Sequence, residues 1–215
     1  MNAKMFGFTA PEDGPLARQM KTAGAIILGT TNVPFMLSDY QTHGEVYPTA
    51  SNPYDTTRTP GGSTGGGAAA LAAGFTTLEI GSDLGGSIRI PAAFCGLYGL
   101  KPSLGAINIT QGTGPDTTTK YTRFALASGG PLARDLEDLE LLWHVLKNVP
   151  PDPRFPAPTE TMAASEKTLD QYRLAWMDQW AREKDGVKVS EDVVSKMKML
   201  ADSLAGHGVK MSHEA

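Results

Sequence analysis

The sequence predicts an α/β fold in which a mixed β-sheet carries helices on both faces. Short apolar runs bounded by glycine alternate with segments of helical periodicity, a pattern typical of sheets covered by helices. Of the 215 residues, 40% are hydrophobic and 20% are charged, so the chain can bury a sizeable core. We expect one domain over residues 1–215.

The first elements are a helix, a strand and a long irregular segment. Residues 13–22 predict an amphipathic helix, and the apolar run 25–28, between two glycines, is typical of a buried strand. Residues 30–60 are rich in Thr, Asn, Pro and Tyr, which predicts irregular structure with a turn at 51–55. A coil of this length inside a compact domain favours a functional loop.

Helices and strands alternate through the middle of the chain. The Ala-rich residues 68–73 predict a closely packed helix that follows a glycine turn. Residues 75–80 predict a strand that runs into a second glycine turn. Residues 88–97 predict a buried helix with Pro91 in its first turn, and 99–103 close it as a turn.

The last part of the chain begins with leucines at helical spacing, which predict a helix over 132–147. A Pro-rich connector follows at 150–158. The remaining predicted elements are a strand at 172–177, a helix between Ser190 and Gly206, and a strand at 209–212.

Two serines, Ser63 and Ser87, each lie in a glycine-rich turn, 24 positions apart. Glycines around a serine let backbone N–H groups approach a reacting atom closely. If the second segment turns tightly, the N–H groups of Leu84, Gly85, Gly86 and Ser87 converge and form an oxyanion hole. Simpler interpretations are a plain glycine turn at Ser87 and a helix cap at Ser63.

The stretch 59–105 closely resembles the amidase signature family. The resemblance rests on Gly61-Gly-Ser-Thr-Gly-Gly66, on Gly81-Ser-Asp-Leu-Gly-Gly-Ser-Ile-Arg-Ile-Pro-Ala-Ala-Phe-Cys-Gly96, on Gly99-Leu-Lys-Pro102 and on Gly105. Weaker similarity at 23–29, 52–53, 130–134 and Asp138 extends it over nearly the whole chain. The resemblance implies hydrolysis of a linear amide C–N bond through a serine acyl-enzyme, with a small-molecule amide as substrate and no cofactor.

The resemblance also implies a role for each matching residue. Ser87 resembles the nucleophile that accepts the acyl group, and Ser63 resembles a relay serine that follows a cis peptide bond after Gly62. Leu84, Gly85 and Gly86 resemble the oxyanion donors, and Asp83 and Arg89 resemble residues that brace the loops.

A neutral lysine in a Lys-Asp motif is the base of the family's Ser-Ser-Lys triad, and it precedes the relay serine at a distance. No Lys-Asp pair precedes Ser63 here. Lys21 is on the predicted first helix, where a solvated role is expected, and Lys4 is near the terminus. A lysine base needs desolvation to be neutral near pH 7, so no lysine of this chain is assigned as the base.

The family also continues past the position of Ala215, so the resemblance implies a domain that is incomplete at both ends. We expect this polypeptide alone to be weakly active or inactive. The alternative of a non-catalytic remnant predicts homo-oligomers or association with other chains through open sheet edges.

Three further alternatives remain open. A glutamine-using amidotransferase subunit belongs to the same family, although Ile90 stands where such subunits carry a polar residue. Gly61-Gly-Ser-Thr-Gly65 formally matches the nucleophile elbow of α/β-hydrolases with Ser63 as nucleophile, but an elbow needs a preceding strand. The same glycines ahead of a helix also suggest a phosphate loop, which lacks the expected Gly-Lys-Ser/Thr.

Composition excludes several other classes of protein. The net charge is −4 and no Lys/Arg-rich run occurs, which argues against nucleic acids and anionic membranes as partners. No apolar run approaches the length of a membrane span. The single cysteine, Cys95, excludes an internal disulfide, and the four histidines lack metal-ligand spacing apart from a loose pair at His207 and His213. We therefore expect a cytoplasmic protein without a metal.

Overall fold

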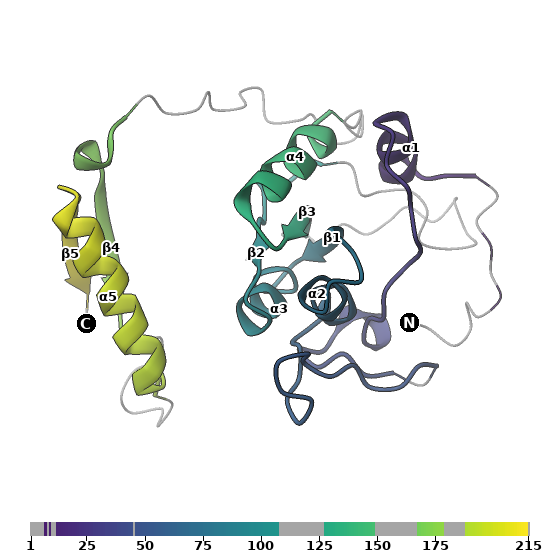
Figure 1. Ribbon diagram of the computed structural model, residues 1–215, viewed down its shortest axis with the longest axis horizontal. Coiled ribbons are helices and arrows are strands. Elements are labelled where there is room, and N and C mark those ends of the chain that lie inside the picture. Colours follow the sequence, from purple (N-terminus) through teal and green to yellow (C-terminus); the bar gives the residue numbers. More distant parts are fainter. Residues whose placement is uncertain are drawn as a thin grey trace. The chain divides into compact units, whose positions relative to one another are not determined.

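The computed structural model describes residues 7, 9, 12–44, 46–107, 127–148, 167–178 and 188–214. The chain forms two compact units, an N-terminal unit up to Thr159 and a C-terminal unit from Glu160 onward (Figure 1). Both units combine helices with strands, so the predicted α/β class is confirmed. The predicted connector at 150–158 lies outside the described residues.

An antiparallel sheet forms the centre of the N-terminal unit. Its described strands lie in the order β1 (Leu78–Asp83), β3 (Ser128–Ala133) and β2 (Tyr98–Gly99). The β1–β3 register runs from Leu78 opposite Ala133 to Asp83 opposite Ser128. All six residues of β3 are buried.

Helices pack on both sides of this sheet. They are α1 (Pro15–Thr22), α2 (Gly65–Ala72), α3 (Arg89–Phe94) and α4 (Leu136–Leu146), with a short 3₁₀ helix at Phe35–Leu37. Figure 1 shows α4 on one side of the strands and α2 and α3 on the other. Two apolar clusters match this arrangement: one contains Leu71, Ile88, Ala92 and Leu132, and the other contains Ile107, Leu142 and Leu146.

Strand β1 sends alternate side chains to the two sides, as the period of a strand requires. Leu78 and Ile80 pack against the cluster that contains Leu142 and Leu146 of α4. The intervening residues face α2 and α3, because a Cβ on Gly67 of α2 would lie 2.5 Å from the Glu79 side chain. The same alternation directs Asp83, at the end of β1, toward the loops that precede α2 and α3.

The C-terminal unit is a two-stranded parallel sheet with a crossover helix. Strand β4 (Arg173–Met177) pairs with β5 (Lys210–Glu214), and α5 (Glu191–Gly206) connects them and packs on β5. A 3₁₀ turn at Leu169–Gln171 precedes β4. The rings of Trp176 and His213, which lie opposite each other in the register, have centroids 4.5 Å apart. The predicted elements of this region are confirmed within two residues.

Two strand predictions in the N-terminal unit differ from the structure. Residues 25–28 form no strand, and Ile26 and Leu28 are 86% and 74% exposed. No described segment pairs with this run, so its apolar composition alone does not produce a strand. Strand β1 begins three residues later than predicted and continues into the glycine-rich segment as far as Asp83.

Strand β3 was not predicted, because its Gly129-Gly-Pro131 sequence is unfavourable in a central strand. Leu132, which the sequence placed in a helix, therefore lies in β3, and α4 begins at Leu136. The glycine turn expected before the Ala-rich helix is instead its first turn, since α2 begins at Gly65. None of the helices in the described ranges is long and apolar enough to cross a bilayer.

Candidate active site

The structure brings the two glycine-rich serine turns together. Ser63 follows a cis peptide bond from Gly62 and precedes α2, and Ser87 precedes α3. The backbone N–H of Thr64 donates to the carbonyl of Ser87 at 3.2 Å, so the residue after one serine contacts the other serine directly. Both serines are largely buried, with exposed fractions of 2% and 9%.

The turn that carries Ser63 fits closely against its neighbours. Gly61 has φ +84°, and a Cβ there would lie 2.8 Å from the Cα of Pro91 in α3. A Cβ on Gly62 would lie 2.5 Å from the carbonyl oxygen of Asp39. Backbone atoms cannot move aside easily, so both positions require glycine. The buried hydroxyl of Thr42 donates to the Gly61 carbonyl at 2.9 Å and fixes the turn further.

The turn that carries Ser87 is organised by Asp83. Its Oδ1 accepts hydrogen bonds from the N–H of Gly86 at 2.8 Å and from Nη2 of Arg89 at 2.9 Å. Its Oδ2 accepts from Nε of Arg89 at 3.0 Å and from the N–H groups of Ile88 and Arg89. The predicted bracing pair, Asp83 and Arg89, is thus in direct contact.

Burial by itself raises the pKa of the Asp83 carboxyl, because it disfavours the charged form. The hydrogen bonds from the Arg89 side chain and from the N–H groups of Gly86, Ile88 and Arg89 outweigh this effect. Together they lower the pKa to about 2, so the group is a carboxylate at neutral pH. Its charge in turn raises the pKa of Arg89, chiefly through their hydrogen bond.

The backbone N–H groups of residues 84–87 differ in whether they already make a hydrogen bond. That of Gly86, a predicted oxyanion donor, is bonded to Asp83. Those of Leu84, Gly85 and Ser87 make no hydrogen bond within the described part of the chain. The turn therefore has three N–H groups that can receive an acceptor from outside.

Sequence reasoning missed a contact from the irregular segment 30–60. The hydroxyl of Tyr40 donates to the carbonyl of Gly85 at 2.9 Å. Beside it, Asp39 pairs with His43 at 2.9 Å, and the hydrogen bond from His43 is the largest of the interactions that lower the Asp39 pKa. No periodicity or motif marks Tyr40 in the sequence, so only the folded arrangement reveals this contact.

The lysines that the structure describes leave the base unassigned. Lys21 is exposed on α1 and pairs with Asp13 at 2.7 Å. Lys101, half-buried, donates to Ser128 at 3.4 Å, at the end of β3 opposite Asp83. Lys4 lies outside the described residues. No group of three or more His, Cys, Asp or Glu side chains in the described ranges is placed to hold a metal.

Two alternative interpretations of the Ser63 turn, the nucleophile elbow and the helix cap, do not match the structure. Residues 56–62 form no strand, so the strand that a nucleophile elbow needs before Ser63 is absent. The N-cap of α2 is Thr64 rather than Ser63, and its side chain makes no capping hydrogen bond. The serine thus serves neither as an elbow nor as a cap.

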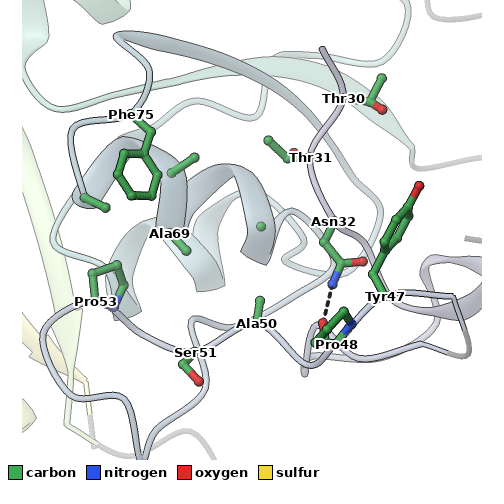
Figure 2. A pocket seen from close by; sticks show the side chains of 13 residues that line it. Thr30, Thr31, Asn32, Tyr47, Pro48, Ala50, Ser51, Pro53, Ala69 and Phe75 are labelled. Carbon is green, nitrogen blue, oxygen red and sulfur yellow. Dashed lines mark hydrogen bonds between the residues drawn. The ribbon is translucent and has the colours of Figure 1, made fainter. Parts of the chain in front are cut away.

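A hollow with a volume of about 590 Å³ lies along α2 and the irregular segment (Figure 2). Ala69 of α2 and Phe75 line one side, and Asn32 donates to the carbonyl of Pro48 at 2.9 Å across the other. Neither Ser63 nor Ser87 contributes to its lining. This hollow is therefore separate from the serine turns.

Burial raises the pKa of the Cys95 thiol to about 11. Its Sγ lies 3.5 Å from the carbonyl oxygen of Pro60, directly before the Ser63 turn. The thiol is therefore protonated at neutral pH and helps to hold the turn rather than acting as a nucleophile.

Comparison with known proteins places this geometry in context. A glutamyl-tRNA(Gln) amidotransferase subunit of Alkaliphilus metalliredigens is 34% identical over 201 residues, which cover 90% of this chain and 39% of that protein. The putative amidase AmiB2 of Mycobacterium bovis is 41% identical over 170 residues, covering 79% of this chain and 34% of that protein. The chain thus spans less than half the length of these relatives.

Solved structures show the same fold. The structure of 6-aminohexanoate cyclic dimer hydrolase complexed with substrate superposes with a TM-score of 0.78 at 27% identity, over 98% of this chain and 43% of that protein. The family model described as Amidase matches residues 4–214. Because this match covers almost every residue, the chain belongs to the amidase family.

Proposed function

We propose that the protein hydrolyses the C–N bond of a linear amide through an acyl-enzyme on Ser87. The observation that carries the proposal is the hydrogen bond from Thr64 to the Ser87 carbonyl, which holds the two serine turns together. Membership of the amidase family and similarity to proteins named as amidases support the same chemistry. Both serines of the proposed chemistry lie in the stretch that the relatives share with this chain.

In this proposal, Ser87 Oγ attacks the amide carbon and forms a C–O bond while the carbonyl π electrons move onto oxygen. The N–H groups of Leu84, Gly85 and Ser87 have no other acceptor in the described part of the chain and bind the oxyanion. Gly86 contributes by holding the turn through Asp83. The Asp83 charge is neutralised by Arg89, so it does not repel the oxyanion strongly.

Proton transfer completes each half of the reaction. Ser63 accepts the proton of the Ser87 hydroxyl and gives its own proton to the departing nitrogen, so that the C–N bond breaks and an amine or ammonia leaves. Water then attacks the acyl ester, the acid is released, and the proton returns to Ser87. The proposal assigns no lysine of this chain as the base.

The proposed substrate is a small-molecule amide, and the proposed location is the cytoplasm. The free, buried thiol of Cys95 supports a reducing compartment. The exposed apolar side chains of Ile26 and Leu28 support association with a further polypeptide, such as a second copy of the chain.

Labelling with a fluorophosphonate tests the proposal, because its phosphorus is attacked by an activated serine and fluoride leaves. We expect one label, on Ser87, identified by mass spectrometry of the digested protein. Labelling requires only the two serine turns, so it is expected even though turnover by this polypeptide alone is expected to be weak or absent. Ser87→Ala abolishes the label, and Ser63→Ala slows it by about 10²–10⁴-fold because proton transfer is lost. Ser51→Ala, which changes an exposed serine away from both turns, leaves it unchanged.

A label on Ser63, or no label on either serine, would contradict the proposed nucleophile. The same variants are then assayed for release of ammonia or amine from simple amides. Turnover that survives Ser87→Ala would also overturn the assignment.

A glutamine-using amidotransferase subunit is the second candidate. The 34% identity over 90% of this chain to a protein named as such a subunit favours it. Ile90, by contrast, gives the turn an apolar neighbour, since a Cβ on Gly86 would lie 2.6 Å from Ile90 Cδ1. Ammonia release from glutamine that exceeds release from simple amides would favour this candidate.

A further inference from the structure

We propose that Tyr40 is a positioning residue for acyl transfer, acting through the peptide group between Gly85 and Gly86. The inference rests on the proposed function, because it concerns the turn that presents Ser87 and the candidate oxyanion donors. It assigns a task to a residue from the irregular segment that carries no recognisable motif.

Both ends of this peptide group are held. Its carbonyl accepts a hydrogen bond from the Tyr40 hydroxyl at 2.9 Å, and its N–H donates to Asp83 Oδ1 at 2.8 Å. In a trans peptide the carbonyl and the N–H point in opposite directions. Tyr40 and Asp83 therefore form hydrogen bonds to opposite sides of the peptide plane and fix its orientation.

The turn needs these two hydrogen bonds because its glycines restrict the backbone conformation very little. Gly86 has φ +122°, a conformation that glycine adopts freely, and Gly85 has no side chain to pack. Rotation of this peptide plane would turn the backbone on either side of it. The N–H groups of Gly85 and Ser87 flank the plane, so their directions depend on it.

The segment with Tyr40 also contacts the other serine turn. A Cβ on Gly62 would lie 2.5 Å from the Asp39 carbonyl oxygen and 3.0 Å from the Tyr40 Cα. Asp39 is itself held by His43 and by the N–H of Gln41. The backbone of this segment thus rests on the Ser63 turn, while the Tyr40 hydroxyl reaches the Ser87 turn.

A purely packing role does not account for Tyr40. The residue is 52% exposed, and it belongs to neither apolar cluster of the N-terminal unit. The hydroxyl is therefore the part of the residue that matters for the site. Removing the hydroxyl alone separates this role from the contribution of the ring.

The test compares Tyr40→Phe with Tyr54→Phe. Tyr54 is an exposed tyrosine whose hydroxyl makes no hydrogen bond in the described part of the chain. We expect Tyr40→Phe to slow fluorophosphonate labelling of Ser87 by on the order of 10- to 100-fold, since small misplacements of reacting groups have such effects. Tyr54→Phe is expected to label at the wild-type rate.

A second measurement follows the peptide directly and needs no activity. Hydrogen–deuterium exchange of the Gly86 amide is expected to become about tenfold faster in Tyr40→Phe, because the peptide has lost one of its two hydrogen bonds. The Phe75 amide, which donates to Ala70 at 2.9 Å, is the internal reference and is expected to keep its rate.

The outcomes distinguish failure of the role of Tyr40 from failure of the proposed function of Ser87. Unchanged labelling together with unchanged Gly86 exchange overturns the role of Tyr40. Faster exchange at both Gly86 and Phe75 indicates general loosening and overturns it as well. If the wild-type protein is not labelled at Ser87, the proposed function fails, and Gly86 exchange still decides whether Tyr40 holds the peptide.

Discussion

At the scale of single residues, the serine turns depend on a buried carboxylate. Asp83 is fully buried, and its two oxygens accept hydrogen bonds from Gly86, Ile88 and Arg89. A buried charge whose partners are all in place is tolerated, whereas removal of one partner leaves the others unsatisfied. Asp83 is therefore the residue on which the shape of the Ser87 turn most depends.

We predict that Asp83→Asn lowers the free energy of unfolding by about 2 kcal/mol, because an amide nitrogen replaces one carboxylate oxygen and leaves N–H groups of the buried turn without an acceptor. Urea denaturation followed by circular dichroism measures the loss. The control is Asp13→Asn, which removes the exposed partner of Lys21 and is expected to cost less than about 1 kcal/mol. Equal losses of stability in the two variants would contradict the larger contribution expected for the buried Asp83.

At the scale of elements, helix α4 supports the sheet from the side opposite the serine turns. Its N-cap residue, Asp135, accepts a hydrogen bond from the N–H of Asp138 at 2.8 Å. Its buried residues Leu142 and Leu146 pack against Leu78 and Ile80 of β1. Because β1 ends at Asp83, the stability of α4 contributes to the placement of the turn.

We predict that Asp135→Ala lowers the free energy of unfolding by about 1 kcal/mol, the usual effect of losing an N-cap. Ser190→Ala is the matched control, because Ser190 is the N-cap residue of α5 but its side chain makes no capping hydrogen bond. Its effect should be clearly smaller. A loss at Ser190 as large as that at Asp135 would contradict the capping argument.

The sequence predicted the helices more accurately than the strands. Segments whose periodicity is strong and local, such as 13–22 and the helix after Ser190, are confirmed because an apolar face alone specifies them. Strand β3 was missed and the strand at 25–28 was wrong, because each outcome depends on whether a distant segment provides a pairing partner. Strands need partners that local patterns do not reveal.

In the candidate site, too, contacts within one sequence motif were predicted and contacts from a distant segment were not. The serine turns and the Asp83–Arg89 pair lie within one motif, so the sequence predicted their proximity. Tyr40 and Thr42 reach the turns from the irregular segment through single hydrogen bonds. Such contacts depend on the path of a coil, which composition does not determine.

At the scale of the whole molecule, two carboxyl groups on β1 respond to pH in opposite directions. The pKa of Asp83 is lowered to about 2, so its stabilising effect is present above its unfolded value near 3.8 and is lost as pH falls toward 2. Burial raises the pKa of Glu79, which the hydrogen bond from Thr31 only partly offsets. Glu79 therefore favours the folded state at acid pH and loses this effect as pH rises.

We predict that Glu79→Gln increases the free energy of unfolding at pH 7 and that this gain is lost as pH falls through the raised pKa of the wild-type carboxyl to the ordinary value of 4.5. The Gln side chain keeps an oxygen that can accept from Thr31. Between pH 3.8 and about 2, the wild-type protein should lose about 1–2 kcal/mol more than Asp83→Asn. Denaturation curves at a series of pH values measure both effects, and a loss of stability in Glu79→Gln at pH 7 would contradict the first.

The buried thiol at position 95 has a practical consequence for spectroscopy. It is the only cysteine of the chain, and it is shielded from solvent and protonated under ordinary conditions. Maleimide dyes and thiol-reactive nitroxide spin labels react with thiolates, so they should not modify Cys95 in the folded protein. A cysteine introduced at a surface position can therefore carry a single reporter group, and the native residue need not be replaced first.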